Sequence, residues 1–168
     1  TMLMDGTDED DETVILELYN PSVGTNLQTP IEHTITITDI DPTPVASFEL
    51  TTQTNDESVA LPVINVNLSV PSARVVSVEY QIDLASSTAT SSLDYSLATT
   101  GTITFLPGET TASLAITAFI VDDTEVEPNE TIVMDLQNPI NATVDVTQNQ
   151  HIYICLLYTS PSPRDTEV

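Results

Sequence analysis

The sequence predicts an all-β chain built as an antiparallel two-sheet β-sandwich of the immunoglobulin-like type, with about seven strands in its main unit. Three observations support this class. Apolar and polar residues alternate in short runs, the period of two that is typical of strands with one buried face. No segment combines a helical apolar period with capping residues. A ten-residue string also recurs at an offset as long as a whole domain.

The recurring string defines the organisation of the chain. Residues 12–21, ETVILELYNP, return as residues 130–139, ETIVMDLQNP, an offset of 130 − 12 = 118 positions. The two histidines, His33 and His151, are separated by the same offset. A period of this length is too long for a solenoid repeat, so it predicts domains in tandem.

The tandem arrangement predicts where the units begin and end. We expect residues 1–41 to be the C-terminal part of a preceding domain and residues 42–154 to be nearly all of the next. The proline-rich residues 41–44 form a stiff junction between them. Residues 155–168 begin CLLYTSPSPRD, which resembles the translation of a sequencing adapter. We therefore expect this tail to be non-native and leave it out of the fold prediction.

The strands of the second unit follow from its alternation. Because neighbouring side chains of a strand point to opposite faces, each run offers one apolar face that a second sheet must cover. The turn at residues 106–109, LPGE, has Pro and Gly at the central positions of a type II turn. We expect it to join its two flanking runs as antiparallel neighbours in one hairpin. The apolar faces comprise Ile64, Val66 and Leu68; Val76, Val78, Tyr80 and Ile82; Ile103 and Phe105; Leu114, Ile116, Ala118 and Ile120; Ile132, Met134 and Leu136; and Val144 with Val146.

The charge of the chain excludes several classes of partner. Asp and Glu total 26 against 2 Lys plus Arg, for a formal net charge of −24, and the two basic residues are Arg74 and Arg164. Phosphate neutralisation needs basic side chains, so we expect no nucleic-acid binding. The longest apolar run, residues 152–158, is far shorter than a membrane span of ~20 residues, so we expect no membrane insertion by this fragment. We expect no enzymatic activity, because no nucleophile, base and orienting group can be assembled around either histidine.

Carboxylates gather just before one strand in both units, within residues 5–12 and within residues 122–130. With no lysine and one distant arginine, Arg74, we expect the chain not to supply the compensating cation itself. Many oxygen ligands favour Ca²⁺ over Mg²⁺, and the lack of cysteine before residue 155 disfavours Zn²⁺. The alternative is a solvated acidic loop that keeps the protein soluble.

Four motifs, taken in order, resemble the Calx-β domain, the calcium-binding module of sodium–calcium exchangers. They are Asp94-Tyr95, residues 101–110 (GTITFLPGET), residues 120–130 with their IVDD start, and residues 136–139 (LQNP). The resemblance covers residues 45–154 and, as a partial copy, residues 1–41. It implies a β-sandwich that binds Ca²⁺ at one end through loops and a terminal acidic run.

The resemblance also implies a set of metal ligands, position by position. The acidic run that should close the second unit after Ile154 is absent from the sequence, so we expect the second site to be incomplete. In the second unit the implied ligands are Glu49, Asp94, Asp122, Asp123, Glu125, Glu127 and Glu130. In the partial copy they are Asp39 and Asp41, beside the loop residues Asp8, Glu9, Asp10 and Asp11.

Together these features predict a calcium-binding Calx-β repeat module of a large secreted or cell-surface protein. Ca²⁺ is the expected cofactor, and it stiffens the array of domains and supports adhesion or matrix contacts. The expected partners are neighbouring Calx-β-like domains of the same chain and a cell-surface or matrix molecule. Two alternatives stay open: a metal-independent structural spacer, and an accessory module of a secreted hydrolase.

Overall fold

The computed structural model describes residues 5–56, 63–114, 120–121 and 128–156. These residues form strands and no helix, so they contain no helix able to cross a membrane. The predicted fold class is confirmed, but the described residues form eleven strands, nine of them in the sandwich, where about seven were expected. They are β1 Glu12–Glu17, β2 Glu32–Ile37, β3 Val45–Phe48, β4 Thr52–Asp56, β5 Asn65–Leu68, β6 Val76–Ile82, β7 Thr100–Phe105, β8 Thr111–Ser113, β9 Glu130–Ile140, β10 Thr143–Val144 and β11 Gln150–Leu156.

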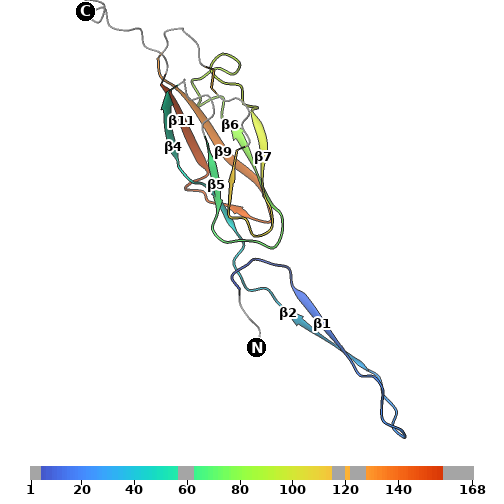
Figure 1. The fold of residues 1–168 in the computed structure, drawn as a ribbon. Helices are drawn as coiled ribbons and strands as arrows, with labels where there is room; N and C mark the ends of the chain where they lie inside the picture. The colour runs from blue at the N-terminus through green and yellow to red at the C-terminus, as the bar shows by residue number, and fades with distance from the viewer. Residues whose placement is uncertain (1–4, 57–62, 115–119, 122–127, 157–168) are drawn as a thin grey trace, which may run out of the picture.

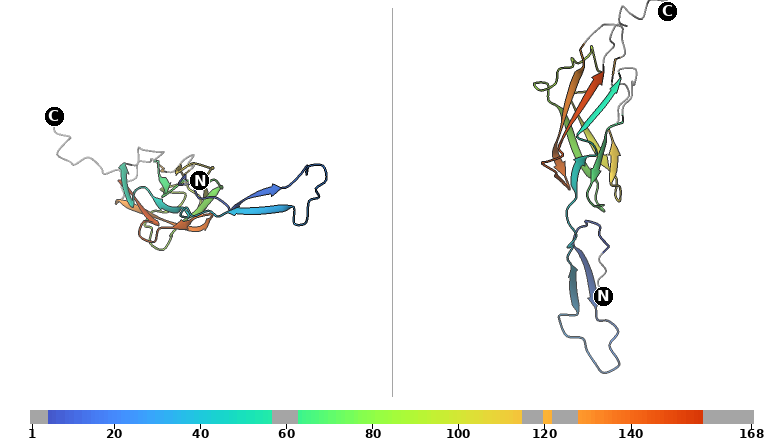
Figure 2. Two further views of the ribbon diagram at one scale, coloured as in Figure 1. Left: turned by 90° about the horizontal axis from the view of Figure 1, so that it is seen from below. Right: turned by 90° about the vertical axis from the view of Figure 1, so that its left-hand side faces the viewer.

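Two sheets form the sandwich, and β1 with β2 forms a separate ribbon that extends from one end of it (Figures 1 and 2). The five-stranded sheet has the order β4-β11-β9-β6-β7, and the four-stranded sheet has the order β10-β3-β5-β8. Pairing is antiparallel as predicted, except that β10 pairs in parallel with β3, and β11 with β4. This exception arises because β3 and β4 are successive parts of one stretch, which passes from one sheet to the other at residues 49–51.

The turn at residues 106–109 has the predicted conformation but not the predicted role. Gly108 has a φ of 84°, and the Glu109 N–H donates to the Leu106 carbonyl over 2.9 Å. However, β7 pairs with β6 in one sheet while β8 pairs with β5 in the other. The predicted hairpin is therefore wrong, and the turn crosses between the sheets. Both flanking strands present apolar faces, and only opposite sheets allow these faces to cover each other.

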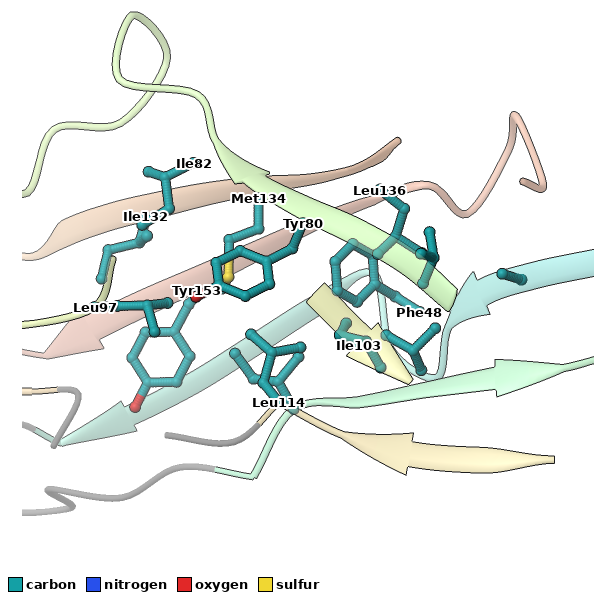
Figure 3. Close-up of a cluster of buried hydrophobic side chains, with 14 of the residues drawn as sticks. Phe48, Tyr80, Ile82, Leu97, Ile103, Leu114, Ile132, Met134, Leu136 and Tyr153 are labelled. Carbon is teal, nitrogen blue, oxygen red and sulfur yellow. The ribbon is translucent and has the colours of Figure 1, made fainter. Parts of the chain in front are cut away.

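The core lies between the two sheets, and Figure 3 shows side chains from both meeting there. The alternation predicted its members well: in β6 every second residue from Val76 to Ile82 is buried. Val146 is an exception, because β10 ends at Val144 and Val146 is exposed. Of the run predicted at residues 114–120, Leu114 and Ile120 are buried, and residues 115–119 lie outside the described part.

The sequence repeat is also a structural repeat. Leu16 pairs with His33 between β1 and β2, and Met134 pairs with His151 between β9 and β11, so both partners shift by 118 positions. The remaining pairs of the ribbon follow the same rule. At the position equivalent to Ile37, Cys155 is buried within β11, which continues past its predicted end at Ile154. The ribbon is therefore a copy of β9 and β11 without the rest of a sandwich around it.

Candidate metal centre at the junction

An acidic pocket of about 330 Å³ lies where the ribbon meets the sandwich. Because Glu12 pairs with Ile37, the residues before β1 and those after β2 are brought to the same place. Six carboxylates line this pocket, together with uncharged residues at and after the end of β2. The lining residues are Asp5, Glu9, Asp10, Glu12, Thr36, Ile37, Thr38, Asp39, Ile40 and Asp41.

Backbone hydrogen bonds hold the carboxylate of Asp39, one of the residues that line this pocket. Its Oδ2 accepts the Glu9 N–H over 2.8 Å, and its Oδ1 accepts the Asp41 N–H over 2.9 Å. In return, the Asp39 N–H donates to Oδ1 of Asp11 over 3.0 Å. The bonds from Asp41 and Glu9 lower the pKa of Asp39, since they favour its charged form. Asp39 therefore stays ionised, and its bonds connect the segment before β1 with the segment after β2.

The charges in the pocket repel one another. The pKa of Glu9 is raised above its ordinary value, first by the charge of Asp5, then by burial and by the charges of Glu12, Asp39 and Asp41. A carboxylate that is harder to ionise because of its neighbours marks a place where positive charge is lacking. A cation that binds here would remove this repulsion.

Arg74 supplies part of the positive charge, which corrects the prediction that it is distant. Arg74 lies just before β6, and its guanidinium pairs with the Asp8 carboxylate and, over 2.9 Å, with Asp10. Asp8 is almost fully buried, and its backbone also bonds to the sandwich: its N–H donates to the Pro71 carbonyl, and its carbonyl accepts the Ala73 N–H. These contacts attach the segment before β1 to the loop before β6. Asp10 belongs to both the arginine pair and the pocket.

Replacing Arg74 by Ala should release residues 5–11 from the sandwich, because the buried Asp8 carboxylate loses its partner charge. The measurement is the amide hydrogen exchange of Ala73, whose N–H is protected by the Asp8 carbonyl. Asp10→Asn is the matched control. It removes only the exposed half of the pair, and exposed pairs contribute little. Unchanged protection of Ala73 in the Arg74→Ala variant would contradict this role.

Only some of the ligands predicted for the first unit line the pocket. Glu9, Asp10, Asp39 and Asp41 line the pocket, whereas Asp8 pairs with Arg74. Asp5 and Glu12 were missing from the ligand set implied by the resemblance, although both belong to the acidic run that sequence analysis noted. Glu12 is the first residue of β1 and Asp5 lies in the segment before it, and both line the pocket.

In the second unit the described ligands do not share a pocket. Glu49 is exposed in the β3–β4 crossover and accepts the Asn65 amide over 2.7 Å. Asp94 is buried and accepts the Thr90 N–H over 2.5 Å, while its carbonyl accepts the Val121 N–H. Glu130 begins β9 opposite Cys155. The other predicted ligands of this unit lie outside the described residues: Asp122, Asp123, Glu125 and Glu127.

The described residues contain no group of three or more Asp, Glu, His or Cys side chains placed so that they could hold a metal ion. The pocket at the junction nevertheless fits a hard cation by its chemistry, because its donors are all oxygens. Its carboxylates would have to close around such an ion.

Comparison with known proteins gives one family and several similar structures. The Calx-beta domain profile matches residues 39–155. The apo-form Calx CBD1 domain is 21% identical with a TM-score of 0.61, over 70% of this chain and 100% of that one. CBD12 from CALX1.2 is 21% identical with a TM-score of 0.55, over 91% of this chain and 70% of that one.

A third structure, calcium binding domain CBD12 of CALX1.1, is 22% identical with a TM-score of 0.58. The match covers 67% of this chain and 45% of that one, so the chain spans less than half of its length. At such identities the structures establish the fold. No curated protein matches the chain.

Proposed function

This chain belongs to the Calx-β domain family, and from that premise we propose that it binds Ca²⁺ in the acidic pocket at the junction. The observation that carries the proposal is the pocket lined by carboxylates, whose mutual repulsion raises the pKa of Glu9. Glu9 is one of six carboxylates that line the pocket, and of these six Arg74 pairs only with Asp10. Ca²⁺ accepts six to eight oxygen ligands in flexible geometry, which suits a pocket that must close around the ion.

The residues proposed to hold the ion are Asp5, Glu9, Asp10, Glu12, Asp39 and Asp41. The ion supplies positive charge that joins the loop before β1 to the segment after β2. Because the Arg74 pair attaches the same loop to the sandwich, a bound ion would also stiffen the connection between the units. Binding in the range of ~10⁻⁴–10⁻³ M is typical of extracellular calcium modules.

Isothermal titration of the full chain with CaCl₂ tests the proposal. We expect binding within that range, and we expect Asp39→Asn/Asp41→Asn to weaken it by about tenfold or more, because two of the six lining carboxylates lose their charge. Glu17→Gln is the matched control, since Glu17 lies in β1 but outside the pocket. If the control and the double variant bind Ca²⁺ equally well, the site is elsewhere. If the unaltered chain takes up no Ca²⁺, the proposal fails.

The ribbon supports a second part of the proposal, that residues 1–41 close a preceding domain of the same kind. Its register equals that of β9 and β11, and its exposed apolar side chains occupy the positions that are buried in the second unit. In such an array the pocket would belong to the preceding domain and Arg74 to the following one. We propose a non-enzymatic role at the cell surface or outside the cell, where the array supports adhesion or matrix contacts.

A metal-independent spacer is the second candidate, and two observations favour it. Arg74 already neutralises part of the acidic loop, and both Asp39 oxygens already accept backbone N–H groups. In that case the junction would keep its exchange protection in the presence of a chelator, and added Ca²⁺ would change nothing. The titration described above distinguishes the two candidates.

A further inference from the structure

A buried histidine, His151, contacts the crossover in which the chain passes from β3 in one sheet to β4 in the other. His151, on β11, is 1% exposed and lies at the edge of the core, with its ring 5.4 Å from that of Phe48 between centroids. Its Nδ1 is 2.5 Å from the Leu50 carbonyl oxygen. Because a carbonyl only accepts hydrogen bonds, Nδ1 carries the proton and the neutral ring leaves Nε2 as a bare acceptor.

This hydrogen bond lies where the chain changes from the four-stranded to the five-stranded sheet. Leu50 is in the crossover between β3 and β4, and the Ile152 N–H next to His151 donates to the Thr51 carbonyl over 2.9 Å. From Ile152 onward β11 pairs with β4 in parallel. The His151–Leu50 bond therefore fixes the point at which the chain leaves one sheet and begins to pair with the other.

Among the described residues, no hydrogen-bond acceptor lies where a second proton on the His151 ring would need one. Nε2 of His151 is buried without a hydrogen-bond partner in the described part of the chain. A protonated ring would place an N–H and a positive charge there, at the cost of burying both. Burial lowers the pKa of His151, and the bond to Leu50 opposes this effect only in part.

Few ionisable groups surround the ring. Beside it is a small cavity of about 10 Å³, and Glu49 is the only other ionisable residue among those described that line it. Glu49 lies just past the end of β3, and its carboxylate accepts the Asn65 side-chain amide over 2.7 Å. On β9 the paired residue is the uncharged Met134, and on β11 the next core residue is Tyr153, whose phenol has a raised pKa. Among the described residues no carboxylate forms an ion pair with the imidazole that would balance its charge.

We propose that His151 is a pH-sensitive contact that holds β4 against β11 only while its ring is neutral. When the ring gains a proton, the uncompensated charge leaves the core, the bond to Leu50 breaks, and the first residues of the β4–β11 pair separate. The change is reversible, since loss of the proton restores the acceptor at Nε2 and lets the ring return.

The direction of the pH dependence follows from linkage. The unfolded chain binds the proton near the ordinary histidine pKa of about 6.5, whereas the folded chain binds it at lower pH. The contribution of His151 to stability is therefore present above that pH and is lost as the pH falls through it toward the folded pKa.

Two measurements on the full chain test the proposal. The first follows the His151 ring signals by NMR between pH 4 and pH 8, with the urea-unfolded chain as reference. We expect the folded signal to titrate at lower pH. The second compares amide protection factors of Thr52–Asp56 and Ile152–Leu156 at pH 7 and pH 5, corrected for intrinsic exchange, and we expect protection of this pair to fall more than that of β6 and β7.

Two variants separate titration from packing. His151→Asn keeps a donor where Nδ1 stands but cannot gain a proton, so its β4–β11 protection should no longer depend on pH. His33→Asn is the matched control, because His33 occupies the same repeat position on the exposed ribbon, and it should behave as the unaltered chain does. A folded-state titration of His151 that coincides with the unfolded one would overturn the proposal. Equal pH-dependent loss of protection in His151→Asn would do so as well. The NMR titration decides the matter even if His151→Asn does not fold.

Discussion

Met134→Ala should lower the free energy of unfolding of the sandwich by about 2–5 kcal/mol, while Leu16→Ala should change it by less than about 0.5 kcal/mol. The two residues occupy the same repeat position, opposite His151 and His33. Met134 is 0% exposed and Leu16 is 52% exposed. The first substitution therefore leaves a cavity in a packed core, and the second removes a side chain that already faces solvent.

Urea denaturation, followed by the fluorescence of the tyrosines, gives both free energies. The comparison is informative because the register of the two strand pairs is the same, so only the presence of an opposing sheet differs. If Leu16→Ala proves as costly as Met134→Ala, the apolar face of the ribbon is covered in solution. A concentration-dependent loss would then identify a second copy of the chain as the cover.

Gly101→Ala should cost about 1–3 kcal/mol, because the new methyl group would overlap the ring of Tyr80. Gly101 pairs with Tyr80 between β7 and β6. A Cβ built at Gly101 lies 2.5 Å from Cε1 of Tyr80 and 2.7 Å from its hydroxyl oxygen. Tyr80 is buried in the core, so its ring can move away only by displacing its neighbours.

A double-mutant cycle with Tyr80→Ala isolates this contact. Once the ring is absent the methyl group has room, so the two losses should be less than additive. Gly108→Ala is the matched control, since a Cβ at Gly108 meets nothing within 4 Å and any loss there comes from its φ of 84° alone. Additive losses in the cycle would show that Tyr80 is not what excludes a side chain at Gly101.

The alternation of apolar and polar residues predicted which side chains enter the core, but not which strands pair. In β6 the inward and outward residues are as the sequence indicates. The same kind of pattern in β7 and β8 carried no information on whether these strands share a sheet, and the hairpin prediction was wrong. Val146 continues the alternation of Val144 but is exposed, because the strand ends before it. Alternation shows which side chains of a strand share a face, whereas the choice of a pairing partner depends on residues far away in the sequence.

For the pocket, the sequence itself indicated the acidic loop, and the resemblance to the Calx-β domain implied that the two aspartates after β2 lie beside it. The structure brings Glu9, Asp10, Asp39 and Asp41 to line a single pocket. The role of Arg74 could not be predicted, since it lies 64 positions from Asp10, and only the docking of the loop on the sandwich brings the two together. Nor could the sequence show that His151 and His33 differ in burial. They are equivalent in the repeat, yet His151 is buried and His33 is exposed.

The sequence by itself determined the all-β class, the inward face of most strands, the 118-residue offset and, through it, the register that β1–β2 shares with β9–β11. These features are local or are copied along the chain, so composition and spacing suffice. Only the tertiary structure decided the crossing of the 106–109 turn, the Arg74 contacts and the burial of His151. Each of these depends on which surfaces come to cover one another, and that is settled by the packing of the two sheets as a whole.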